Sequence, residues 1–87
     1  VSINSPNLSD QISIYPNPVS NGALHIDNNS GNAINVKMVD LFGKSTLNQS
    51  INRNASINLD NVSNGIYFVE IESKGERIIK KVVVDKQ

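Results

Sequence analysis

Apolar residues recur at every second position along most of the chain, and short clusters of Gly, Asn, Asp and Ser separate these stretches. A two-residue period is typical of a β-strand with one buried face, and the cluster residues favour turns. No stretch shows a helical period. The pattern predicts an all-β fold, a seven-stranded antiparallel β-sandwich of immunoglobulin-like type. The predicted strands are residues 12–15, 23–27, 33–41, 44–51, 55–59, 65–72 and 76–85.

The strand predicted at 33–41 changes phase along its length. Ile34, Val36 and Met38 would face one side, whereas Val39 and Leu41 continue the apolar pattern on the other. This indicates either a bulge near Met38 or a segment that is covered on both faces.

The last two predicted strands form a hairpin across residues 73–75. Pairing across Lys74 and Gly75 is expected to bring Ile79 beside Val69 in the core. The second arm is apolar on both faces and is interrupted by Lys80 and Lys81. It is therefore either a covered central strand or an exposed edge that the two charges keep soluble.

Two further turns have a clear residue pattern. Asp40 and Gly43 occupy the first and fourth positions of a predicted type I turn, which gives Gly43 a positive φ. A side chain at Gly43 should therefore not be tolerated. Residues 63–65 predict a left-handed bend just before Ile66.

Length and charge limit the functions that this chain can have. Its 87 residues form one domain with a thin core, so a deep catalytic cleft is not expected. Eight Lys+Arg balance eight Asp+Glu, which argues against nucleic acid as a partner. No apolar run approaches the roughly 18 residues of a membrane span, so no membrane insertion is expected. Residues 1–11 read as a linker to an upstream domain, and residues 12–87 as the folded unit.

Candidate chemistry is sparse. His25 is the only histidine, and strand alternation turns it outward, which favours neither catalysis nor metal binding. The sequence therefore predicts no enzyme activity and no cofactor. Asp27 begins a loop that resembles the start of a calcium site, but its glycine comes early and no Glu follows. A turn-rich loop explains this segment, and calcium near Asp27 stays an open alternative.

Four blocks of the sequence together resemble a known family. They are Tyr15-Pro16-Asn17-Pro18, Val39-Asp40-Leu41-Phe42-Gly43-Lys44, Asn64-Gly65-Ile66-Tyr67-Phe68-Val69 and Lys80-Lys81-Val82-Val83-Val84. In this order, with the last block near the chain end, they are similar to the type A C-terminal sorting domain of the type IX secretion system of Bacteroidetes.

The resemblance implies a non-catalytic secretion signal at the end of a larger cargo protein. It implies as partners the upstream cargo domain, an outer-membrane shuttle and translocon, and a sortase-like peptidase that removes the signal on surface attachment. The protein would be exported, present in the periplasm in transit and then at the cell surface or outside the cell.

The resemblance also implies which residues matter. An architectural role is expected for the residues that match the first three blocks, because prolines fix φ and a buried Tyr needs a hydroxyl partner, as in a tyrosine corner. These residues are Pro16, Asn17, Pro18, Asp40, Gly43, Lys44, Gly65 and Tyr67. Recognition is expected at the final block, where an accessible strand offers main-chain pairing and two charges. Its residues are Lys80, Lys81, Val82, Val83 and Val84.

The same strands could also build an accessory immunoglobulin-like module that binds glycans or separates two domains. The four aromatic residues are scattered along the chain, which gives a sugar-binding face little support.

Overall fold

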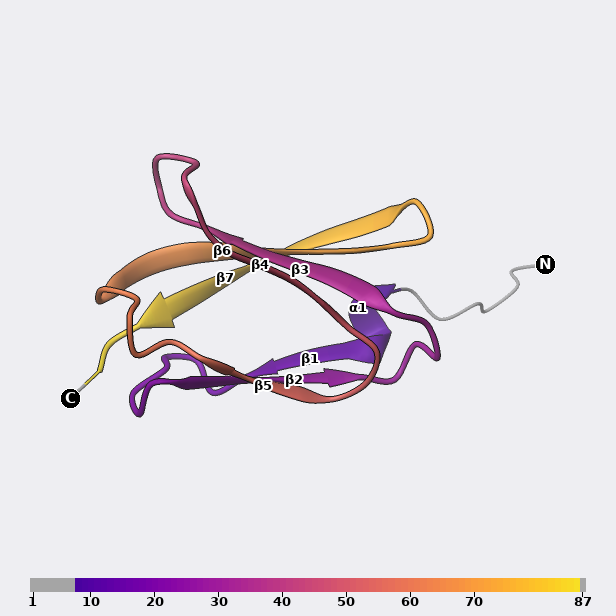
Figure 1. The fold of residues 1–87 in the computed structure, drawn as a ribbon, viewed down its shortest axis with the longest axis horizontal. Helices are drawn as coiled ribbons and strands as arrows, with labels where there is room; N and C mark the ends of the chain where they lie inside the picture. Colours follow the sequence, from indigo (N-terminus) through magenta and orange to yellow (C-terminus); the bar gives the residue numbers. More distant parts are fainter. Residues whose placement is uncertain (1–7, 87) are drawn as a thin grey trace.

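The computed structural model describes residues 8–86 and shows two antiparallel sheets packed face to face (Figure 1). The lower sheet in Figure 1 has the order β1-β2-β5, with β1 (Ile12–Tyr15), β2 (Ala23–Asn28) and β5 (Ala55–Asn58). The upper sheet has the order β4-β3-β6-β7, with β3 (Ile34–Val39), β4 (Ser45–Ile51), β6 (Gly65–Ser73) and β7 (Glu76–Val84). The predicted seven-stranded, immunoglobulin-like sandwich is confirmed.

The core lies between the sheets, and alternate side chains of each strand build it. In β3 and β6 the buried positions follow the two-residue period of the sequence, with Glu70 and Glu72 on the outer face of β6. The least exposed side chains are Val19, Leu24, Ile26, Ile34, Val36, Met38, Leu59, Val69, Ile71, Val82 and Val84.

One short helix was not expected. Leu8–Gln11 forms a single helical turn, α1, inside the segment predicted to be a linker. The Gln11 carbonyl accepts a hydrogen bond from the Asn29 amide at 2.9 Å, so the chain is tied to the domain before β1 begins. One turn is too short to give a helical period, so the sequence pattern could not reveal it. Residues 1–7 of the predicted linker lie outside the described residues.

The predicted bulge near Met38 lies in the pairing of β3 with β4. The pairing of β3 with β4 shifts register between Met38 and Val39. Strand β3 ends at Val39, and Leu41 lies in the following turn, 61% exposed. The extra residue is Thr46 of β4, because Met38 pairs with Leu47 and Val39 with Ser45, and β3 keeps an unbroken register with β6. The alternative of a segment covered on both faces is wrong, because Leu41 is exposed.

The β6–β7 hairpin turns at Lys74 and Gly75, as predicted, but in a different register. Lys74 and Gly75, at φ 49° and 82°, form a two-residue turn, and Ser73 pairs with Glu76. This geometry suits a tight hairpin because two positive φ angles match the strand twist. The register is one residue from the predicted one: Val69 pairs with Lys80, and the expected Val69–Ile79 pair is wrong.

The bend before β6 is also different. Gly65 has φ 158°, which is close to an extended strand, and it is already the first residue of β6. A bend does precede β6, at Asn64, but Gly65 itself lies in the sheet, where it pairs with Val84.

Candidate functional site

Strand β7 lies at the edge of the four-stranded sheet, so the alternative of a covered central strand is wrong. In an antiparallel pair, hydrogen-bonded residues alternate with residues whose main-chain groups point away from the neighbouring strand. Because the two-residue turn makes Ser73 and Glu76 a hydrogen-bonded pair, the outward positions of β7 are 77, 79, 81 and 83. These outward groups form the outer edge of the sandwich at β7.

A segment between β1 and β2 closes the C-terminal half of this edge. The Asn17 side-chain amide donates to the Lys81 carbonyl at 3.1 Å and accepts from the Val83 amide at 3.0 Å. Val19 continues the contact: its amide donates to the Val83 carbonyl at 2.8 Å, and its carbonyl accepts from the Asp85 amide at 2.9 Å. We call Asn17 and Val19 the edge clamp.

The edge clamp gives the Tyr-Pro-Asn-Pro block a specific place in the fold. Pro16 and Pro18 flank Asn17, and the peptide bonds before both prolines are cis. Tyr15 ends β1, and Pro16, Asn17 and Pro18 lie between β1 and β2. The Asn17 amide uses one N–H donor and its oxygen acceptor here, so it mimics a peptide group of a neighbouring strand. Sequence reasoning missed this contact because it joins residues that are 64 and 66 positions apart.

The chain stays anchored after β7. The Lys86 amide donates to the Asn64 side-chain oxygen at 2.9 Å. The Lys86 ammonium donates to the main-chain carbonyls of Leu59 and Asp60, at 3.0 and 3.1 Å. The end of β7 is thus held from two sides, by the edge clamp and by the loop between β5 and β6.

The five residues predicted for recognition are divided between the two faces of β7. Val82 and Val84 are each 1% exposed and belong to the core. Lys81 is exposed, and Val83 is half-buried on the outer face. Lys80 is half-buried on the inner side, opposite Val69. A partner could therefore contact Lys81 and the strand edge without disturbing the core, but not the side chains of Val82 and Val84.

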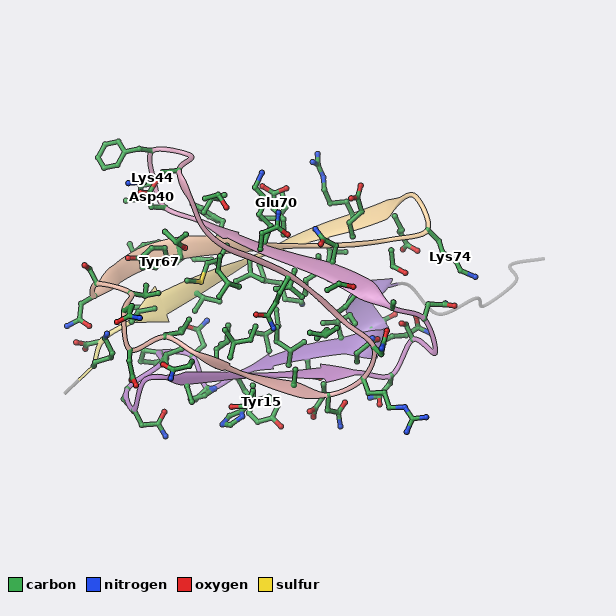
Figure 2. All side chains as sticks on the ribbon, in the orientation of Figure 1. Tyr15, Asp40, Lys44, Tyr67, Glu70 and Lys74 are labelled. Atoms are coloured by element: carbon green, nitrogen blue, oxygen red, sulfur yellow. The ribbon has the colours of Figure 1, made fainter. Side chains whose placement is uncertain are left out.

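The β3–β4 turn is fixed around Asp40 (Figure 2). The Gly43 amide donates to the Asp40 carbonyl at 3.0 Å, and Gly43 has φ 83°, which confirms the predicted turn. One Asp40 carboxylate oxygen accepts from the amides of Phe42 and Lys44 at 2.8 and 2.9 Å. The turn presents Leu41 and Phe42 to solvent, and Phe42 is 94% exposed.

The Gly-x-Tyr block anchors the start of β6. Tyr67 is 7% exposed, and its hydroxyl donates to the Ser63 carbonyl four residues upstream, at 2.7 Å. This is the arrangement of a tyrosine corner, in which a buried hydroxyl holds the backbone that enters a strand.

With these four blocks placed, comparison with known families becomes informative. The chain matches the family described as the secretion system C-terminal sorting domain over residues 13–85. The chain belongs to this type IX sorting-domain family. A search of curated proteins found no match.

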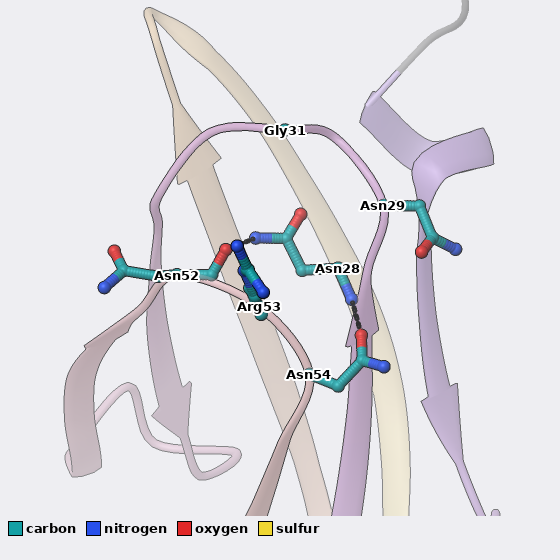
Figure 3. A pocket seen from close by; sticks show the side chains of 6 residues that line it. All are labelled: Asn28, Asn29, Gly31, Asn52, Arg53 and Asn54. Carbon is teal, nitrogen blue, oxygen red and sulfur yellow. Dashed lines mark hydrogen bonds between the residues drawn. The ribbon is translucent and has the colours of Figure 1, made fainter.

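The sorting domain also contains a polar recess at the end of the sandwich near α1 (Figure 3). Its volume is about 400 Å³, and it is lined by Asn28, Asn29, Gly31, Asn52, Arg53 and Asn54. The Asn28 side chain is buried, and both its amide nitrogen and its oxygen form hydrogen bonds. It donates to the carbonyls of Asn32 and Asn52 and accepts from Ser30. The loop after Asp27 is thus held by its own side chains.

Asp27 itself points to the outer face of the three-stranded sheet. Its carboxylate accepts hydrogen bonds from the Tyr15 hydroxyl at 3.2 and 3.3 Å. This hydrogen bond is the main cause that raises the pKa of Tyr15 above its ordinary value, and desolvation and the charge of Asp27 act in the same direction. Within residues 8–86, no three His, Asp or Glu side chains gather in a way that could hold a metal ion.

His25 lies on the same outer face, as strand alternation predicted. Its ring packs against Tyr15 with centroids 5.4 Å apart and a tilt of 33°. The contact is one of aromatic packing between cross-strand neighbours.

None of the helical structure in residues 8–86 is long and apolar enough to cross a lipid bilayer.

Proposed function

We propose that the sorting domain is a non-catalytic C-terminal signal that directs a larger cargo protein across the outer membrane by the type IX secretion system. The match to the sorting-domain family over residues 13–85 carries this proposal. The cargo passes through the periplasm with the folded domain attached and then reaches the cell surface or the medium.

Two kinds of partner act on the domain in this proposal. An outer-membrane shuttle and translocon bind the folded sandwich, and a sortase-like peptidase removes it when the cargo is attached to the surface. Cleavage falls in or before residues 1–11. From Gln11 onwards the chain is part of the folded domain, because Gln11 bonds to Asn29 and β1 begins at Ile12. A compact two-sheet sandwich is suited to a secretion signal that its partners recognise by its folded shape.

A reporter fusion tests this proposal. Residues 1–87 are joined to a fluorescent protein that carries an export leader, and the fusion is expressed in a Bacteroidetes host with and without a working type IX system. The expected result is reporter outside the cell only when the system is present. Retention of the reporter in the periplasm of the intact host would contradict the proposal.

Deletion of residues 80–87 is a poor test of recognition, because it also removes part of the core. Val82 and Val84 are each 1% exposed, so the deletion should unfold the sandwich. Point substitutions on the outward positions of β7 separate recognition from folding.

One observation favours a second function, that of an accessory glycan-binding module. The recess near Asn28 presents several amide groups and the Arg53 guanidinium, which are suitable hydrogen-bond partners for a sugar. Binding of the purified domain to a glycan array, lost in Arg53→Ala, would support this function. Identical array signals for both proteins would exclude the recess as the glycan site.

A further inference from the structure

The edge clamp leaves the other half of the β7 edge unpaired. Asn17 and Val19 occupy the outward groups from the Lys81 carbonyl to the Asp85 amide. Among residues 8–86, no hydrogen bond outside the β6–β7 ladder reaches the main-chain groups of Arg77 or Ile79. We call the outward main-chain groups of Arg77 and Ile79, together with the Lys81 amide, the open edge.

The open edge is accessible. Ile79 lies at its centre and is 56% exposed, and Arg77 and Lys81 are exposed on either side. Arg77 makes a long ion-pair contact of 3.5 Å with Glu70 across the hairpin. Helix α1 lies beside β7 on this side of the sandwich, but no hydrogen bond joins the two elements within the described residues. Figure 1 shows the β6–β7 turn standing clear of α1.

Charges on an edge strand can serve only to prevent aggregation. Two features of the β7 edge are not explained by protection from aggregation alone. The domain already protects the other half of the edge with a dedicated segment, and it places a large apolar side chain at the centre of the half that it leaves open. An edge that only needed protection would be expected to carry a polar residue at position 79.

The charges also favour one occupant over another. If two copies paired their open edges antiparallel about Ile79, Arg77 of each copy would lie opposite Lys81 of the other. Like charges directly opposite destabilise a strand pair, so self-pairing is disfavoured. A strand with carboxylates at these two positions would instead be attracted and held in register.

We propose that the open edge takes up an extended segment of a partner protein as an additional strand. The incoming segment pairs with the main chain of residues 77–81, lays an apolar side chain beside Ile79, and places carboxylates near Arg77 and Lys81. The inference rests on the proposed function in one respect: the partner belongs to the secretion machinery.

The outward direction of the Ile79 amide allows a sharp test. Ile79→Pro removes one outward donor and leaves the β6–β7 ladder intact, since proline is tolerated at an edge when its missing donor faces solvent. Ile79→Ser is the matched control, because it shortens the same side chain and keeps the amide. Both variants are placed in the reporter fusion, and the melting temperature of each purified domain is measured.

We expect Ile79→Pro to lower secretion at least tenfold with a melting transition retained, and Ile79→Ser to lower it by no more than a few fold. Secretion of folded Ile79→Pro at the level of the unmodified fusion would overturn the proposal. Equal loss in both variants would also overturn main-chain pairing, because it would assign recognition to the side chain.

A second variant decides the question if Ile79→Pro does not fold. Arg77→Glu with Lys81→Glu reverses both charges on exposed positions, and Lys44→Glu with Arg53→Glu makes the same change in net charge at exposed positions outside β7. Loss of secretion in the first pair alone supports the proposal, and equal secretion of both pairs overturns it. If the unmodified fusion itself is not secreted, the proposed function fails, whatever the variants do.

Discussion

Asn17 shows how a single side chain can replace a strand. Its amide takes the place of a peptide group against Lys81 and Val83, at distances of 3.1 and 3.0 Å. The Asp40 side chain also bonds to the main chain: in the β3–β4 turn, one of its carboxylate oxygens accepts hydrogen bonds from two backbone amides. Both are polar residues on the surface, and both act by satisfying main-chain groups that would otherwise be unpaired.

The edge clamp predicts a loss of stability in Asn17→Ala. Two hydrogen bonds to β7 disappear, and each contributes about 0.5–1.5 kcal/mol, so the free energy of unfolding should fall by about 1–3 kcal/mol. Denaturant unfolding measures this change. Asn35→Ala, at an exposed position of β3, is the control and should leave the unfolding midpoint nearly unchanged. Equal stability of the two variants would show that the clamp contributes little to the fold.

Gly43 gives a second prediction for a single residue. Its φ of 83° is unfavourable for a β-branched residue, although a Cβ would meet nothing within 4 Å. The cost of Gly43→Val is therefore backbone strain alone, about 1–2 kcal/mol. The sequence-based expectation that no side chain is tolerated here is too strong, because the space is open and the domain should still fold. Thermal unfolding tests this. A melting temperature equal to that of the unmodified domain would contradict the turn geometry.

At the scale of elements, β7 has two different faces and two different halves. Its inner face completes the core, and its C-terminal half is closed by the edge clamp. Sequence periodicity could not separate these roles, because valine occupies both faces at Val82, Val83 and Val84. Only the pairing with β6, set by the two-residue turn at Lys74 and Gly75, decides which valines are buried.

Adjacent valines in β7 allow a direct comparison. Val82→Ala should lower the free energy of unfolding by about 2 kcal/mol, since it removes buried methyl groups and leaves a cavity. Val83→Ala, at a half-buried position on the outer face, should cost less than about 1 kcal/mol. Denaturant unfolding of both variants measures the difference. A larger loss in Val83→Ala would show that the register of the hairpin is wrong.

At the scale of the whole molecule, the sequence allowed more to be predicted about the strands than about their neighbours. The two-residue period is local, so the seven strands and their inward residues could be recognised. Which strand lies at an edge depends on pairing between distant segments, such as residues 16–19 with β7. The recognition block was identified by resemblance, but the division of its residues between core and surface required the fold.

The edge of β7 is closed along one half by the edge clamp and open along the other half. Amide hydrogen exchange of the purified domain, followed residue by residue by NMR, tests it most directly. Slow exchange is predicted for Val83 and Asp85, whose amides bond to the edge clamp, and fast exchange for Arg77, Ile79 and Lys81. Equally slow exchange at all five amides, or fast exchange at Val83 and Asp85, would contradict the claim.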